Sequence, residues 1–394
     1  MLQTEKLINA LSESPVFIRK LILKRLLKYE KVDKTLIPTP KNRIALNFAS
    51  KYYYSVLSPS HCAYIAYRSG LQGASINDYA SLSSAKEFVS ACKVLNLPYT
   101  LGYHAECVPL FNEKQASCYT YGIPYNRIKS IEKDLADIRS EKKDHIEALI
   151  KKINSRLKKY KINVSLLEVL ASSTYFKGGA VTEKHVCNVL AKRIIELYKT
   201  GESIIDFLNT VLKIELNQTE KDCILSSDNK YLNEDVTRVI YANVSVFKAG
   251  ETLREATEFF KINKICGGIT AYKLRIKSYN EEDLLNKIKV LKDKNFEAVA
   301  FDDTSLTSED SEKVVTLLLD NDMLPIAVNR MGMPRQVLLA GNMNEKIYSS
   351  MLAVIGSSIS SAFDVDDGIF GVNTLLKCPS LSKRIELFKN IVLN

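Results

Sequence analysis

The sequence has few of the features that mark several common protein classes. Its 394 residues include no tryptophan and no run of eighteen apolar residues, so no membrane-spanning helix is expected. The eight cysteines form no C-x-x-C pair and are too sparse for a disulfide scaffold, and the N-terminus lacks a signal-peptide pattern. No glycine-rich nucleotide fingerprint, internal repeat or low-complexity tract is present. These absences predict a cytoplasmic protein with reduced thiols.

Acidic residues are outnumbered, since 55 Lys and Arg against 45 Asp and Glu leave a net charge of +10. The excess is segmental: residues 1–41 hold nine basic and four acidic residues, and residues 126–161 hold twelve and six. A solvated helix face explains such segments more simply than a nucleic-acid groove, and no nucleic-acid motif is present. We expect no nucleic-acid partner, whereas a protein partner for the basic helices stays open.

Residues 16–29 form an amphipathic segment with apolar residues at helical spacing and a strongly basic opposite face. Such a helix can dock on a membrane surface or on a partner. Packing on the rest of the protein as an N-terminal arm is the favoured interpretation, because neither a lipidation motif nor a tryptophan accompanies it.

The stretch from residue 58 to residue 107 organises the chain. Ser58 and Pro59 are typical of an N-cap and a first helical position, and Gly70 ends that helix. A strand near 74–76, a helix over about 83–95 and a strand over 99–102 follow. This α-β-α-β order predicts a parallel sheet, in which ligands bind at the carboxyl ends of strands. The expected site is therefore at Asn77–Ala80 and Tyr103–Glu106.

Helices are predicted in the middle of the chain, and the β/α alternation returns after residue 239. The predicted helices there cover 128–162, 182–198 and 203–212. The later strands are predicted at 244–247, 268–272, 298–301 and 324–328, and the later helices at 252–261, 280–294 and 308–321.

Four segments from Asn47 onward follow a known pattern in order. Residues 47–55 correspond to H-x-H-T-x-Y-S, and residues 58–59 to the S-P that precedes a helix. Residues 78–80 correspond to a D-H-D turn, and residues 102–104 to G-x-E. The chain thereby resembles the PHP (polymerase and histidinol phosphatase) family, whose members are mostly metal-dependent phosphoesterases. The metal ligands differ: the first two histidines fall on Asn47 and Ala49, the turn histidine on Tyr79 and the glutamate on His104.

The resemblance continues to a bacterial branch of the family that carries a helical insertion. Residues 118–122 resemble S-Y-H-M-G, with Thr120 in place of histidine, and residues 181–185 resemble V-T-x-R-H with the histidine retained as His185. Residues 328–336 resemble a G-E-D-I-N-S-P-R-Q turn with Arg330 in place of aspartate, and residues 355–358 resemble I-G-H-E without its histidine.

The resemblance implies an α/β fold, a PHP-like distorted β/α barrel with an inserted α-helical segment. The implied organisation is a basic N-terminal helical arm over 1–41, barrel segments over 42–125 and 239–394, and the helical insertion over 126–238.

The resemblance also implies a degenerate metal site. The positions at which the family places ligands are here Asn47, Ala49, Tyr79, Thr120 and Arg330. A multinuclear phosphoesterase site needs several imidazole and carboxylate ligands at about 2.0–2.2 Å from each ion. Amide, phenol and methyl groups are poor substitutes, and an arginine adds positive charge where a cation should lie.

Polar residues that follow the predicted strands could face one cavity at the barrel mouth. The candidate ligand-binding residues are Asp78, His104, Asp302, Asp303, Arg330 and Arg335. For Asp302 and Asp303 a helix N-cap or a solvated loop is at least as good an interpretation, and for Arg335 a structural ion pair is an equal one.

Three functional hypotheses follow. The first is a PHP homologue without a working metal centre, and so without a cofactor, that binds a phosphate-bearing or other anionic ligand through guanidinium groups. The second is an active phosphoesterase with one Zn or Mn ion held by Asp78, His104, Asp302 and Asp303. The third is a non-catalytic interaction protein that uses its basic helices. The missing ligands favour a protein that is not an enzyme.

Overall fold

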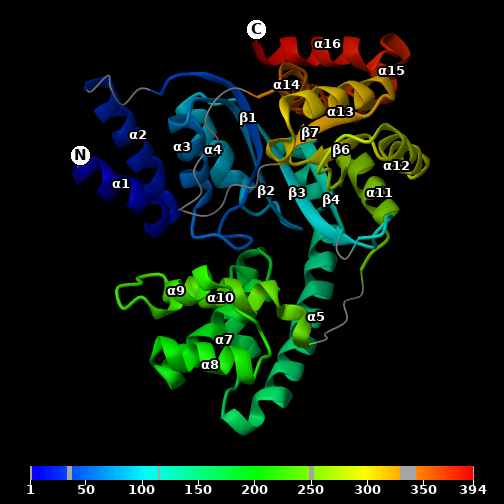
Figure 1. The fold of residues 1–394 in the computed structure, drawn as a ribbon. Coiled ribbons are helices and arrows are strands. Elements are labelled where there is room, and N and C mark those ends of the chain that lie inside the picture. Colours follow the sequence, from blue (N-terminus) through cyan, green and yellow to red (C-terminus); the bar gives the residue numbers. More distant parts are fainter. Residues whose placement is uncertain (1, 33–37, 114–115, 248–252, 329–342, 394) are drawn as a thin grey trace. The chain divides into compact units, whose positions relative to one another are not determined.

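The computed structural model describes residues 2–32, 38–113, 116–247, 253–328 and 343–393 (Figure 1). The chain divides into two compact units, the first formed by residues 1–136 and 253–394 and the second by residues 137–252. The first unit is a mixed α/β structure, whereas the second contains only helices in its described part.

The first unit is built on one seven-stranded sheet whose strands follow one another in chain order and curve into a nearly closed barrel (Figure 1). Its strands are β1 (Lys41–Phe48), β2 (Leu71–Tyr79), β3 (Tyr99–Cys107), β4 (Ala116–Ile123), β5 (Ile269–Lys273), β6 (Ala298–Phe301) and β7 (Leu324–Ala327). Only β4 runs antiparallel to its two neighbours, and the other pairs are parallel. Most strand residues are buried because helices cover the outside of the sheet. The expected distorted β/α barrel is confirmed.

Helices surround this sheet. They are α1 (Leu2–Glu13), α2 (Val16–Val32), α3 (Pro59–Arg68), α4 (Ala85–Leu95), α11 (Ala256–Cys266), α12 (Glu281–Asp293), α13 (Ser308–Asp320), α14 (Glu345–Ser360), α15 (Val372–Lys377) and α16 (Leu381–Leu393), with short 3-10 helices η2 (Tyr125–Ser130), η6 (Asp303–Ser305) and η7 (Val365–Asp367). Twelve consecutive residues of α14, from 347 to 358, are buried. A side chain on Gly356 would come within 2.0 Å of the Phe388 carbonyl oxygen, so this glycine lets α14 and α16 pack closely.

The predicted cap at Ser58 is confirmed, whereas the strand predicted at 244–247 is wrong. The Ser58 hydroxyl accepts a hydrogen bond from the His61 N–H at 3.1 Å, so Ser58 caps α3 as predicted, with Pro59 at the first turn. Residues 244–247 were expected to form a strand, but they form the 3-10 helix η5 (Val244–Phe247) in the second unit. A short apolar run has no preferred period, and here Phe247 packs into a helical core instead of a sheet.

The basic segment near the N-terminus forms α2, which packs on α3 and α4. The Arg19 guanidinium donates to both carboxylate oxygens of Glu87 in α4, each at 2.9 Å. Glu87 also accepts from the backbone N–H and the hydroxyl of Ser60, at 3.0 and 2.7 Å. Both members of this ion pair are nearly buried, with side chains 11% and 9% exposed. It therefore anchors α2 to the barrel.

The second unit is a helical cluster around an apolar core. Its helices are α5 (Glu132–Leu157), which begins in the first unit, η3 (Lys158–Tyr160), α6 (Leu166–Ala171), η4 (Tyr175–Lys177), α7 (Glu183–Tyr198), α8 (Gly201–Thr210), α9 (Gln218–Leu225), α10 (Leu232–Ala242) and η5. Thr182 caps α7, and the His185 ring accepts the Thr182 N–H at 3.1 Å in a capping box. The histidine that the sequence retains thus has a structural role in this unit.

Charged groups are buried beside that cap. Burial alone would raise the pKa of Glu183, but the Lys142 ammonium at 2.5 Å and a hydrogen bond from His145 lower this pKa to about 2. Burial lowers the pKa of His185 to about 4.

Among the described residues, no helix is long and apolar enough to cross a membrane.

Replacing Glu87 by alanine should lower the free energy of unfolding by about 3 kcal/mol, because the Arg19 guanidinium would be left buried without its partner. Urea unfolding followed by circular dichroism would measure this loss. Glu309→Ala, which breaks an exposed pair with Lys313, is the matched control and should have no measurable effect. Equal stabilities of the two variants would contradict the anchoring role of Glu87.

Replacing His185 by glutamine should make the protein less sensitive to acid. The folded-state pKa of His185 is about 4 against an ordinary 6.5, so its neutral ring stabilises the fold above pH 6.5, and this contribution is lost as the pH falls towards 4. Glutamine can still accept the Thr182 N–H but does not titrate. Between pH 7 and pH 4.5 the wild type should lose about 2 kcal/mol more unfolding free energy than the variant.

Urea unfolding at the two pH values would test this difference. The control is Lys192→Gln, which changes an exposed residue of the same helix α7 and should behave as the wild type. A His185→Gln variant that loses as much stability in acid as the wild type would disprove the role of His185.

Candidate functional site

The carboxyl ends of β2 and β3 and the facing part of β4 lie side by side. Tyr79 of β2 pairs in register with His104 of β3, and His104 pairs with Tyr119 of β4. A side chain on Gly102 would come within 2.3 Å of the Thr120 carbonyl oxygen, so glycine is needed for this close approach. The two segments in which the sequence predicted the site, 77–80 and 103–106, are therefore adjacent.

Five aromatic rings occupy this end of the barrel, and we refer to them as the aromatic cluster: Tyr53, Tyr79, His104, Tyr119 and Tyr121. The His104 ring stacks on Tyr119 at 5.3 Å between centroids, and Tyr119 stacks on Tyr121 at 5.9 Å. Tyr53 and Tyr79 meet the His104 ring edge to face at 5.1 and 5.6 Å. None of the five residues is more than 8% exposed, so the His104 ring is buried among three tyrosine rings.

Two asparagines hydrogen-bond to rings of this cluster. The Asn47 side-chain oxygen accepts from the Tyr121 hydroxyl at 2.9 Å, and its amide nitrogen lies 3.4 Å from the Ala327 carbonyl oxygen of β7. The Asn77 side-chain oxygen accepts from Nδ1 of His104 at 3.0 Å. Each amide is at most 2% exposed and has hydrogen-bond partners. Asn47 therefore joins the first and last strands where the PHP resemblance expects a metal ligand.

Asp78 is fully buried next to the aromatic cluster. One carboxylate oxygen accepts the Ser50 N–H at 2.7 Å, and the other accepts the hydroxyls of Ser50 at 2.8 Å and Ser84 at 2.7 Å. These three donors tie the loop after β1 and the start of α4 to the end of β2. The carboxylate is thus a structural acceptor in the described residues.

Thr120 lies on the other face of β4. Successive side chains of a strand point to opposite faces, so Thr120 points away from the face that carries Tyr119 and Tyr121. Its hydroxyl donates to the Asn263 side-chain oxygen of α11 at 3.0 Å, and the Tyr103 hydroxyl donates to the same oxygen at 2.9 Å. The structure does not bring Thr120 together with Asn47 and Tyr79.

Among the described residues, the other candidates from the sequence do not come together in one metal-binding group. Asp302 is exposed and caps η6, accepting the Thr304 N–H at 3.0 Å, which matches the alternative interpretation for this residue. Asp303 begins η6 and is half-buried, and Ala49 is buried just after β1. Arg330 and Arg335 lie outside the described residues. No group of three or more His, Cys, Asp or Glu side chains in the described part of the chain could hold a metal ion.

The sequence interpretation missed most of this cluster. Tyr53, Tyr119 and Tyr121, and the hydrogen-bonding roles of Ser50 and Ser84, were not singled out. A signal was present in the sequence, since Tyr119 and Tyr121 alternate in a strand and so share one face. Their burial beside His104 depends on pairing between distant strands.

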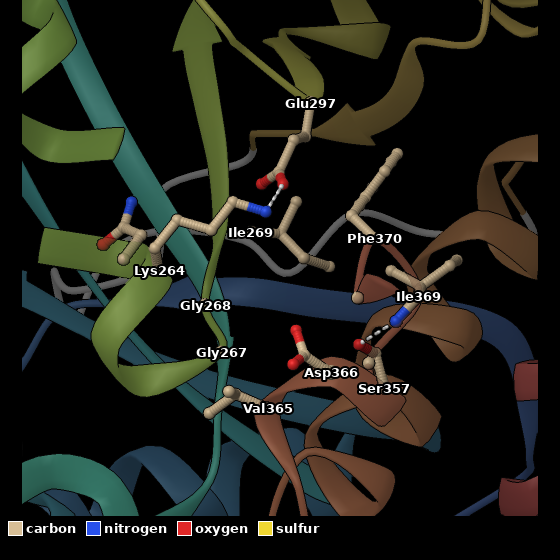
Figure 2. Close-up of a pocket in the computed structure, with 13 residues that line it drawn as sticks. Lys264, Gly267, Gly268, Ile269, Glu297, Ser357, Val365, Asp366, Ile369 and Phe370 are labelled. Carbon is tan, nitrogen blue, oxygen red and sulfur yellow. Dashed lines mark hydrogen bonds and ion pairs between the residues drawn. The ribbon is translucent and has the colours of Figure 1, made fainter. Parts of the chain in front are cut away.

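A small hollow of about 30 Å³, partly open to solvent, lies near the start of β5 and β6 (Figure 2). Glu297, just before β6, has a side chain only 14% exposed and accepts the Thr270 N–H at 3.0 Å. Burial raises the pKa of Glu297 to about 7, although the Lys264 ammonium lies 3.8 Å away. This carboxyl can therefore exchange a proton near neutral pH. The sequence interpretation did not identify it.

Sequence comparisons identify no relatives. No family model matches the chain, and no curated protein is significantly similar to it.

Solved structures do share its fold. A protein from Bifidobacterium adolescentis, provisionally assigned as a metal-dependent phosphoesterase, superimposes with a TM-score of 0.51 at 13% identity, over 80% of this chain and 98% of that one. An amidohydrolase from Chromobacterium violaceum, solved with bound sulfate and no metal, gives 0.50 at 10% identity, over 77% and 92%. Identities this low show the fold alone. This chain therefore shares the fold of these two proteins, the distorted β/α barrel that its sequence predicted.

Proposed function

We propose that this protein is a PHP-like barrel that does not hydrolyse phosphoesters and that binds an anionic small molecule at its mouth. The observation that carries the proposal is the aromatic cluster with Asn47, which stands where the family resemblance places metal ligands. In the described residues, these rings and amides hydrogen-bond to one another, and no set of three or more His, Cys, Asp or Glu side chains converges on a possible ion site.

The chemistry of the remaining groups supports the absence of a multinuclear centre. Several anionic or imidazole ligands are needed to hold two or more divalent ions and to lower the pKa of a bridging water. His104 stacks on Tyr119 and is hydrogen-bonded to Asn77, and the Asp78 carboxylate already accepts three hydrogen bonds. Recruiting the Asp78 carboxylate to an ion would break buried hydrogen bonds, each of which is costly to leave unmade.

An anionic ligand is supported by the sequence and by one structural neighbour. Arg330 and Arg335 follow β7 in the chain, and guanidinium groups bind phosphate and carboxylate in bidentate fashion. The Chromobacterium violaceum protein of the same fold holds sulfate without metal. A protein of this fold can therefore bind an oxyanion without metal.

Metal content, turnover and anion binding should be measured on one preparation purified without chelator. We expect well under one Zn, Mn or Fe per chain by elemental analysis, no turnover of p-nitrophenyl phosphate with added Zn or Mn, and a higher melting temperature in inorganic phosphate. An anion present at about 100 times its Kd would stabilise the fold by about 2.7 kcal/mol. Arg330→Ala with Arg335→Ala should abolish this shift, whereas Arg238→Ala, an exposed arginine of the second unit, should not.

Stoichiometric metal together with metal-dependent turnover would overturn the proposal and favour a working phosphoesterase with a reduced site. A melting temperature that phosphate leaves unchanged would remove the anionic ligand from the proposal.

Asp78→Asn tests whether Asp78 is a structural hydrogen-bond acceptor or a metal ligand. The amide would place N–H groups against the donors on Ser50 and Ser84, so the free energy of unfolding should fall by about 2–4 kcal/mol, while the metal content stays unchanged. Asp302→Asn, at the exposed cap of η6, is the control and should lose much less stability. A variant that keeps its stability but loses bound metal would identify Asp78 as a ligand.

A further inference from the structure

Helix α2 has an outer face that the fold does not use. At about 100° per residue its exposed positions fall within half of the helix circumference. Three of them are bulky and apolar: Phe17 is 77% exposed, Leu21 64% and Val16 53%. Four others are exposed cations, namely Lys20, Lys24, Arg25 and Lys28.

The described side chains that α2 buries lie on its opposite side. Leu23 and Leu26 are fully buried, and Arg19 is held by Glu87. Glu30, also buried, accepts a hydrogen bond from the Tyr67 hydroxyl at 3.0 Å. The helix is thus fixed without help from its outer face, and exposed apolar groups that gather on one face mark an interaction surface.

The cations on this face are not neutralised. In the described part of the chain none of the four forms an ion pair, and the acidic residue of α2 with a described side chain, Glu30, is buried. Lysines of other helices differ, because Lys287 pairs with Asp283 in α12 and Lys313 pairs with Glu309 in α13. The outer face of α2 therefore keeps its full positive charge.

We propose that α2 docks the protein on a membrane surface that carries anionic phospholipids. Phe17 and Leu21 enter the boundary between headgroups and acyl chains, and the four cations lie over the lipid phosphates. An interfacial helix needs this combination of apolar and cationic side chains on one convex face. Nucleic acid matches the charge but provides no apolar layer for Phe17 and Leu21.

Vesicle co-sedimentation with the full chain tests the proposal. We expect binding to vesicles that contain phosphatidylserine, none to pure phosphatidylcholine, and loss of binding in about 1 M salt, where charges are screened within about 3 Å. Lys20→Gln, Lys24→Gln and Lys28→Gln combined should weaken binding about 100-fold. Phe17→Ala with Leu21→Ala should weaken it at least about tenfold.

A matched control separates α2 from the overall positive charge. Lys289→Gln, Lys292→Gln and Lys294→Gln remove the same charge from exposed positions in and next to α12 and should leave binding within about twofold of the wild type. All substituted positions are exposed, so the melting temperature should not change.

Equal losses in the α2 and α12 variants would overturn the proposal, because binding would then follow net charge alone. So would an unchanged affinity of the Phe17→Ala, Leu21→Ala variant, or binding to RNA or an acidic protein without binding to vesicles.

Discussion

The barrel depends on the rule that buried polar groups must be hydrogen-bonded. At its carboxyl end, Asn47 bonds to Tyr121, Asn77 bonds to His104, and Asp78 accepts from Ser50 and Ser84. These bonds join β1 to β4 and β2 to β3, and they tie the end of β2 to the loop after β1 and to the start of α4. Side-chain hydrogen bonds and stacked rings therefore hold these strand ends together.

That arrangement separates the fold from the chemistry usually associated with it. A phosphoesterase barrel carries its ligands on loops and strand ends, so several ligands can be replaced while the sheet and its helices persist. In this chain the polar and aromatic groups at the strand ends satisfy one another, since the Tyr121 hydroxyl donates to Asn47 and Tyr119 stacks on His104.

The two ends of the first unit and its N-terminal helix have different physical characters. The aromatic cluster is buried. The hollow near Glu297 is small, and burial raises the pKa of the Glu297 carboxyl to about 7. The outer face of α2 is instead exposed, apolar at its start and basic further along. Recognition of a small anion and attachment to a surface would therefore involve separate parts of this unit.

The sequence by itself determined the β/α order and the Ser58 cap, because these follow from local spacing and residue type. It did not determine that 244–247 is a 3-10 helix, because a short apolar run takes its conformation from what it packs against. Only the tertiary structure decided that Thr120 faces α11 while Tyr119 and Tyr121 close around His104. Those neighbours come from strands and helices far apart in the chain, and strand register alone sets which side chains share a face.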